Sequence, residues 1–129
     1  MKKNWFTIKK VHDYVYAIAE FNHWEKVVSY LLIGKEKAYL IDTGMGYENI
    51  KKEVDKITSL PVTVLLTHAH WDHIGSTAEF NNIHLFDHKF EKDSLKKGFI
   101  STDIEELSEQ KFFEDDFKNP KASVTKDAL

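Results

Sequence analysis

A helical segment enclosed between two short apolar runs limits the possible folds of this chain more than any other part of the sequence. From Tyr47 to Ile57, apolar side chains recur at helical spacing with Lys and Glu between them, which predicts an amphipathic helix with one buried stripe. The runs Lys37–Ile41 and Val62–Leu66 flank it, and the second run is typical of a strand buried on both faces. A strand–helix–strand crossover favours parallel pairing. Both strands then end at one edge of the sheet, where α/β sheets bind ligands.

The segments before this unit predict a meander of about four strands. Phe6–Ile8, Tyr14–Ala19 and Val27–Ile33 lead into the run Lys37–Ile41, with a turn at residues 34–36. Downstream, the sequence predicts a short helix, a short strand and two further helices at Ile74–Phe80, Ile83–Phe86, His88–Lys97 and about Asp103–Phe113. We therefore expect one α/β domain over residues 1–129, with a mixed sheet, flanking helices and a frayed end at residues 119–129.

The composition excludes several classes of function. The formal net charge is -3 over 129 residues, and acidic residues are mixed among the lysines, so no basic surface for nucleic acid is indicated. The chain contains no cysteine, which excludes disulfides, thiolate metal sites and a thiol nucleophile. No apolar run follows the amino-terminal lysines as in a signal peptide, and no stretch is long enough to span a membrane. A cytoplasmic location is the expectation.

Four potential metal ligands fall within six residues directly after the second apolar run: His68, His70, Asp72 and His73. Imidazole and carboxylate ligands suit zinc, and also iron or manganese. In an extended segment, residues two apart point the same way, so His68 and His70 can share one metal. If the chain turns into a helix at Asp72, then Asp72 and His73 reach a neighbouring position. The spacing therefore favours two adjacent metals over a single four-coordinate site. Three histidines and an aspartate directly after a buried strand also argue against the plainer alternative of surface histidines at a strand end.

These residues carry a resemblance to a known family. His68-x-His70-x-Asp72-His73 matches the HxHxDH signature of the metallo-β-lactamase superfamily, and Leu40-Ile41-Asp42-Thr43-Gly44 resembles its upstream IDTG element. The similarity extends over about residues 10–90, and the tryptophan inside the motif resembles glyoxalase II and other small hydrolases. It implies the amino-terminal half of an αββα sandwich.

The resemblance also implies a role for each residue. His68 and His70 would hold one zinc ion, Asp72 and His73 a second, and Asp42 would orient the ligands by hydrogen bonds. The two metals would share a hydroxide that attacks an ester, thioester, lactone or phosphodiester in a small-molecule substrate. Asp72 and Asp42 are therefore the candidate catalytic residues beside the four candidate ligands.

The family takes further ligands from its second half, and this sequence offers no counterpart for them. His84 and His88 lie close to the motif and are expected to be ordinary residues. We therefore expect a half-domain or truncated chain that alone binds zinc weakly and hydrolyses little. Its uncovered core face would favour self-association or pairing with a carboxyl-terminal half.

Two alternatives of other classes remain open. One is a non-catalytic zinc-binding or interaction module that has kept the motif. Asp42-Thr43-Gly44 also resembles the triplet of dimeric retroviral-type aspartic proteases, although a helical stripe follows it and the histidines are left unexplained. The roles of two tryptophans are also left open. Trp71 either lines a pocket or packs against its loop, and Trp24 with His23 forms either a loop over the metal site or an exposed turn.

Overall fold

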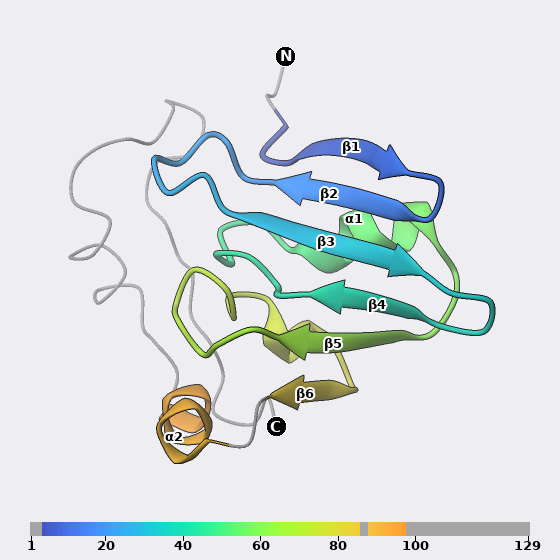
Figure 1. The fold of residues 1–129 in the computed structure, drawn as a ribbon. Helices are drawn as coiled ribbons and strands as arrows, with labels where there is room; N and C mark the ends of the chain where they lie inside the picture. Colours follow the sequence, from blue (N-terminus) through green and yellow to red (C-terminus); the bar gives the residue numbers. More distant parts are fainter. Residues whose placement is uncertain (1–3, 86–87, 98–129) are drawn as a thin grey trace.

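The computed structural model describes residues 4–85 and 88–97 of the chain (Figure 1). Its strands and helices follow in the order β1 (Thr7–His12), β2 (Val15–Ala19), β3 (Val28–Ile33), β4 (Ala38–Ile41), α1 (Ile50–Ile57), β5 (Val62–Leu66), the 3₁₀ turn η1 (Thr77–Glu79), β6 (Ile83–Leu85) and α2 (Lys89–Lys97).

These strands form one six-stranded mixed sheet in the order β1-β2-β3-β4-β5-β6. The strands β1 to β4 pair antiparallel as a meander, whereas β4 pairs parallel with β5 and β5 pairs parallel with β6. The predicted meander and the predicted parallel pairing are both confirmed. Because β4 and β5 run in the same direction, Asp42 and Thr67 leave the sheet side by side.

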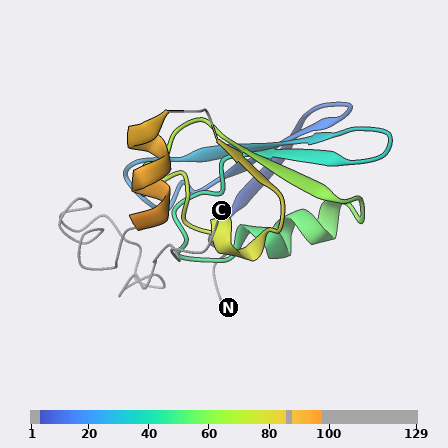
Figure 2. The same cartoon turned by 90° about the horizontal axis from the view of Figure 1, so that it is seen from below.

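The main core lies between this sheet and the helix α1. Figure 2 shows α1 and η1 on one side of the sheet. A row of fully buried side chains crosses the strands on that side, formed by Leu31, Leu40 and Val64, which lie opposite one another in the register. Ile50 and Val54 of α1 belong to the same buried cluster. The predicted buried stripe of the helix is therefore confirmed at Ile50 and Val54.

Local contacts explain where α1 begins and ends. The side chain of Asn49 accepts the backbone N–H of Lys51 at 2.8 Å, and this N-cap starts the helix at Ile50. The expected start at Tyr47 is wrong because the cap lies two residues later; the ring of Tyr47 instead packs edge-on against Trp5, with centroids 5.4 Å apart. At the other end, the Thr58 N–H donates to Val54 O and the backbone becomes extended.

Other expected elements differ in extent. The first strand runs on to His12, because β1 pairs with the whole of β2 through an irregularity between Lys10 and His12. The expected helix at residues 74–80 is only the 3₁₀ turn η1, and the expected helix at about residues 103–113 and the frayed end at 119–129 lie outside the described residues. Neither helix of the described ranges is long and apolar enough to cross a membrane.

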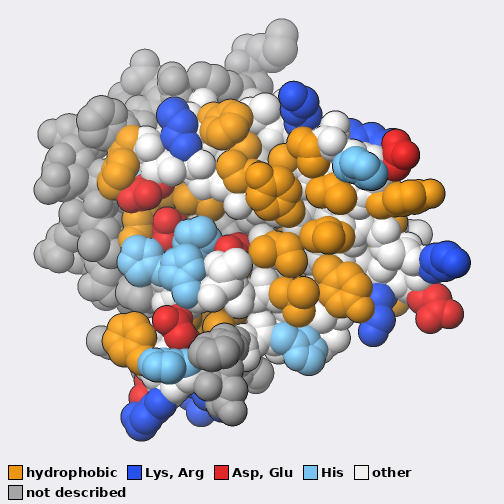
Figure 3. Space-filling view, viewed as in Figure 1, with side chains coloured by type: hydrophobic (Ala, Val, Ile, Leu, Met, Phe, Trp, Pro, Cys, Tyr) orange, Lys and Arg blue, Asp and Glu red, His pale blue; other side chains and the backbone are white. Residues whose placement is uncertain are grey.

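The second face of the sheet is largely apolar and open to solvent in the described part of the chain. The register places Ala17, Tyr30, Ile41 and Leu65 in one row on this face, and Val15, Leu32 and Tyr39 in the next row. Tyr30 is 44% exposed and Leu32 is 38% exposed. Figure 3 shows hydrophobic side chains gathered over the strands on this side. The expectation that β5 is buried on both faces is confirmed for the face toward α1, but on the open face Leu65 is only half-buried.

Candidate metal centre

Asp42 occupies the first position after β4 and holds the neighbouring loop by three hydrogen bonds. Its Oδ1 accepts the Thr67 backbone N–H at 2.8 Å, and its Oδ2 accepts the Thr67 hydroxyl at 2.7 Å. The same Oδ2 lies 2.8 Å from His73 Nδ1. Asp42 has φ 66°, in the left-handed region that Asp tolerates better than most residues. This conformation turns the chain away from β4 while the side chain stays over the end of β5.

These hydrogen bonds fix the orientation of two candidate ligands. His73 Nδ1 donates to Asp42 in the tautomer that leaves Nε2 free to bind a metal. The Thr67 hydroxyl gives its own proton to Asp42 and lies 2.9 Å from His68 Nδ1, so it can accept a proton from that ring. Asp42 therefore orients His73 directly and His68 through Thr67, with the Nε2 atom of each ring available.

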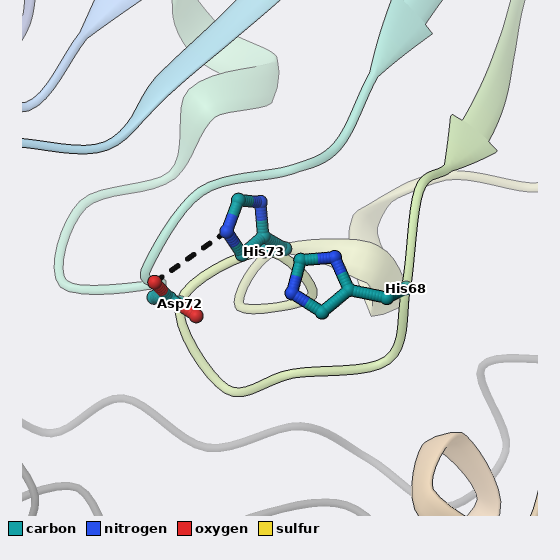
Figure 4. Close-up of side chains that lie close together, drawn as sticks. All are labelled: His68, Asp72 and His73. Atoms are coloured by element: carbon teal, nitrogen blue, oxygen red, sulfur yellow. Dashed lines mark ion pairs between the residues drawn. The ribbon is translucent and has the colours of Figure 1, made fainter. Parts of the chain in front are cut away.

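Three candidate ligands converge at this point. Ligand atoms of His68, Asp72 and His73 all lie within 4.8 Å of one another. The close-up in Figure 4 shows these three side chains gathered together. Asp72 Oδ2 lies 3.5 Å from His73 Nε2, and the rings of His68 and His73 have centroids 4.3 Å apart. Two imidazole nitrogens and a carboxylate oxygen are a common donor set for zinc and similar ions, so these residues fit a metal.

The fourth candidate, His70, lies beside this group. Its Nδ1 is 2.7 Å from Asp72 Oδ1, the carboxylate oxygen turned away from His73. Its ring is stacked near that of His68, with centroids 5.8 Å apart and an interplanar angle of 16°, as expected for residues two apart in an extended segment. The side chain of His70 is 52% exposed, so it lies at the outer side of the group.

Backbone contacts join the two loops that carry these residues. The Thr43 N–H donates to His73 O at 2.8 Å, and the Gly75 N–H donates to Gly44 O at 2.8 Å. The Thr43 hydroxyl also lies 3.1 Å from the hydroxyl of Thr77, which is fully buried. The loop after β4 and the loop after β5 therefore form one connected unit, and these contacts hold the segment with the candidate ligands, residues 68–73, without regular secondary structure.

The surroundings of His73 favour its protonated form. Burial lowers the pKa of His73, but the hydrogen bond to Asp42 and the negative charges of Asp72, Asp42 and Glu20 outweigh it, so the pKa is raised overall. A site that stabilises an imidazolium also stabilises a bound cation, because both interact with the same carboxylates. The electrostatic field at the centre is therefore suited to a positive ion.

Glu20, which the sequence analysis missed, lies buried beside the loop after β4. Its Oε1 accepts the indole N–H of Trp5 at 2.7 Å, and its Oε2 accepts the Met45 backbone N–H at 3.0 Å. Gly44 packs so closely on this carboxylate that a Cβ there would overlap with it. In the sequence, this contact was indicated only by the position of Glu20, a single charged residue at the end of an apolar strand.

The buried position perturbs the acidity of Glu20. Burial raises its pKa to about 7, while the hydrogen bonds from Trp5 and Met45 oppose this shift; the charge of Asp72 raises the pKa further and that of His73 lowers it. Glu25, in the turn between β2 and β3, has its pKa raised by burial and then by the charge of Asp72. Both carboxylates, from the segment between β2 and β3, thus interact electrostatically with the centre.

The aromatic residues near the centre are mainly structural. His23 and Trp71 are fully or almost fully buried, and their rings meet edge-on with centroids 6.0 Å apart. Burial lowers the pKa of His23 to about 4; the charge of Asp72 opposes this shift, and that of Lys26 adds to it. Trp71 packs in a cluster with Trp5, Val27 and Met45, which belong to other segments of the chain, so the observed role is packing, but not against its own loop as expected. Trp24 is 40% exposed in the same turn as Glu25.

Sequence comparison identifies the family. The sequence pattern described as the Metallo-beta-lactamase superfamily matches residues 24–89, which include β3 to β6 and all the candidate ligands. The chain therefore belongs to the metallo-β-lactamase superfamily. It is 24% identical over 108 residues to "Acyl-coenzyme A thioesterase MBLAC2" of Bos taurus, and 33% identical over 76 residues to "Probable metallo-hydrolase YqgX" of Bacillus subtilis (strain 168).

Solved structures show the same fold. The metallo-beta-lactamase from Pontibacter korlensis superposes with a TM-score of 0.58 at 19% identity, covering 71% of this chain and 47% of that one. The DIM-1 metallo-beta-lactamase superposes with a TM-score of 0.53 at 17% identity, covering 73% and 47%. The alignments with the two curated relatives cover 73% and 57% of this chain but only 38% and 36% of theirs. The chain thus corresponds to less than half the length of these proteins.

Proposed function

We propose that this chain supplies part of the active site of a metal-dependent hydrolase, with His68, His70, Asp72 and His73 as metal ligands. The observation that carries the proposal is the convergence of His68, Asp72 and His73 ligand atoms within 4.8 Å at the carboxyl edge of the sheet. Membership of a superfamily that generally binds metal ions supports it. Zinc is the proposed metal, two ions in a complete site, and iron or manganese suit the same ligands.

The residues divide the work in this proposal. His68 and His70 bind one metal, and Asp72 with His73 binds the other, while Asp42 holds the rings of His68 and His73 in the required tautomer through the hydrogen bonds described above. Bound metal supplies Lewis acidity, which activates water and stabilises negative charge on a carbonyl or phosphoryl oxygen. The proposed substrates are small molecules with an ester, thioester, lactone or phosphodiester bond; the thioesterase name of one relative favours testing thioesters first.

Zinc titration tests the first step of the proposal. We expect calorimetry of the metal-free chain to show saturable zinc binding that EDTA reverses, because the donor set is already assembled. Hydrolysis of a thioester, a lactone and a phosphodiester is then measured with and without zinc. Failure to bind zinc at millimolar concentration would refute the proposal. Tight binding of two ions per chain would instead contradict the expectation that this chain lacks part of the ligand set.

A second candidate function is a non-catalytic zinc-binding or interaction module. It uses the same cluster of His68, Asp72 and His73, without a catalytic role for the bound ion. Saturable zinc binding without hydrolysis of any of the three substrate classes would support it. The aspartic-protease alternative is set aside, because the chain belongs to another superfamily and Asp42 is engaged with Thr67 and His73.

We further propose that the open face of the sheet pairs with a second copy of this chain. Of the side chains in the rows on β2 to β5, defined above by Tyr30 and Leu32, all but the buried Thr63 are apolar or Tyr, and none is charged, so two copies meet there without repulsion between like charges. We expect sedimentation to show a dimer that Tyr30→Lys converts to a monomer. Ile8→Lys is the control, since Ile8 is 39% exposed but lies on the opposite face. A wild-type monomer would refute the pairing and favour a different partner half.

A further inference from the structure

We propose that Glu91, on α2, is a positioning residue of the metal centre that holds the backbone between His68 and His70. The inference rests on the proposed function, since it concerns the same ligands. It adds to the centre a residue that lies outside the loops after β4 and β5. Glu91 contacts Ala69, which lies 22 positions earlier in the sequence.

The contact is a single short hydrogen bond. Glu91 Oε2 accepts the backbone N–H of Ala69 at 2.5 Å. Ala69 is 5% exposed and lies between His68 and His70, so its peptide sets the direction in which both side chains leave the backbone. A carboxylate that accepts a backbone N–H forms a charge-assisted bond, which is stronger than a bond between neutral groups.

The helix α2 is fixed well enough to act through this bond. Leu95 follows Glu91 by one helical turn, so both lie on the same face, and Leu95 is fully buried in the main core cluster. Lys89 and Asp93 pair with each other at 2.6 Å on the exposed surface of the helix. Figure 1 shows α2 beside the end of β6, at the edge of the sheet where the metal-binding loop lies.

Within the described residues, the Ala69 peptide is held by this hydrogen bond and by the packing of its side chain in the main core cluster. Thr67 is tied to Asp42, and the His73 N–H donates to His70 O at 2.9 Å, so both ends of the segment are fixed. The Ala69 N–H between them is directed to Glu91. Without that acceptor, the segment that carries two ligands loses its central hydrogen bond, and metal binding must then fix the direction of this peptide.

Cobalt titration of three variants tests the inference, since the visible spectrum of Co²⁺ reports on its ligand geometry. We expect Glu91→Ala to weaken cobalt binding about 10-fold, the effect typical of removing a residue that orients ligands, and to alter the spectrum. Glu91→Gln keeps an oxygen acceptor and is expected to restore most of the affinity and the wild-type spectrum. Asp93→Ala is the control: it removes a carboxylate from the same helix without touching the loop.

Amide hydrogen exchange separates this inference from the proposed function. We expect the Ala69 amide of the metal-free protein to exchange slowly in the wild type and faster in Glu91→Ala, while core amides of β3 and β4 stay protected in both. Equal exchange of Ala69 in the two proteins, or wild-type cobalt affinity and spectrum in Glu91→Ala, would overturn the positioning role. If the wild type binds no cobalt while Ala69 exchange still depends on Glu91, the proposed function fails and the contact alone stands.

Discussion

Replacing Asp72 with alanine is expected to weaken zinc binding at least about 100-fold, more than the loss of a residue that only orients ligands. Asp72 is 7% exposed, and its two oxygens face different histidines: Oδ1 lies 2.7 Å from His70 Nδ1 and Oδ2 lies 3.5 Å from His73 Nε2. The substitution therefore removes a ligand and the negative charge that both rings share. Isothermal titration calorimetry of the metal-free proteins measures the effect.

Asp55→Ala is the matched control for this experiment. It changes the net charge of the chain by the same amount, but Asp55 is exposed on α1 and pairs only with Lys51 at 2.7 Å in the described contacts. Its removal is expected to leave zinc binding unchanged, because the charge lies outside the centre and is screened by solvent. Zinc affinity of Asp72→Ala within threefold of wild type would show that the metal binds elsewhere, and the assignment of the ligands would be wrong.

The sequence predicted the part of the centre that follows from local pattern and one topological rule. The crossover from β4 through α1 to β5 requires Asp42 and Thr67 to lie at neighbouring strand ends, and the structure places three hydrogen bonds from Asp42 there. The spacing of the motif also indicated that His68 and His70 lie side by side, as their stacked rings do.

The remaining contacts of the centre have no periodic or local signal. Glu20 reaches Met45 across 25 positions, and Glu91 reaches Ala69 across 22. Each is an isolated carboxylate whose partner is a backbone N–H, and every residue except proline offers that donor. Only the packing of β2 and α2 against the loops selects the partner. The sequence alone therefore does not indicate which backbone N–H groups Glu20 and Glu91 accept.

Gly75→Ala is expected to lower the free energy of unfolding by about 3 kcal/mol, near the upper end of what added bulk costs in a packed interior. A Cβ at Gly75 would overlap with backbone atoms of Met45 and Gly46, and backbone cannot move aside as a flexible side chain does. Relief requires the two loops to separate, which breaks the hydrogen bond from Gly75 N–H to Gly44 O. Urea denaturation of the metal-free proteins, followed by circular dichroism, measures the loss.

The same substitution at Gly34 provides the comparison. A Cβ at Gly34 would meet one backbone oxygen, that of Lys37 at 2.6 Å, in the exposed turn between β3 and β4. That turn can adjust without disturbing the core, so we expect a loss of about 1 kcal/mol, as for other modest steric changes. Equal losses for Gly34→Ala and Gly75→Ala would mean that the two loops are not held together. Gly75 follows His73 by two positions. A larger loss at Gly75 would therefore show that the loop with the candidate ligands keeps its conformation through the close approach of two backbones, which only glycine permits.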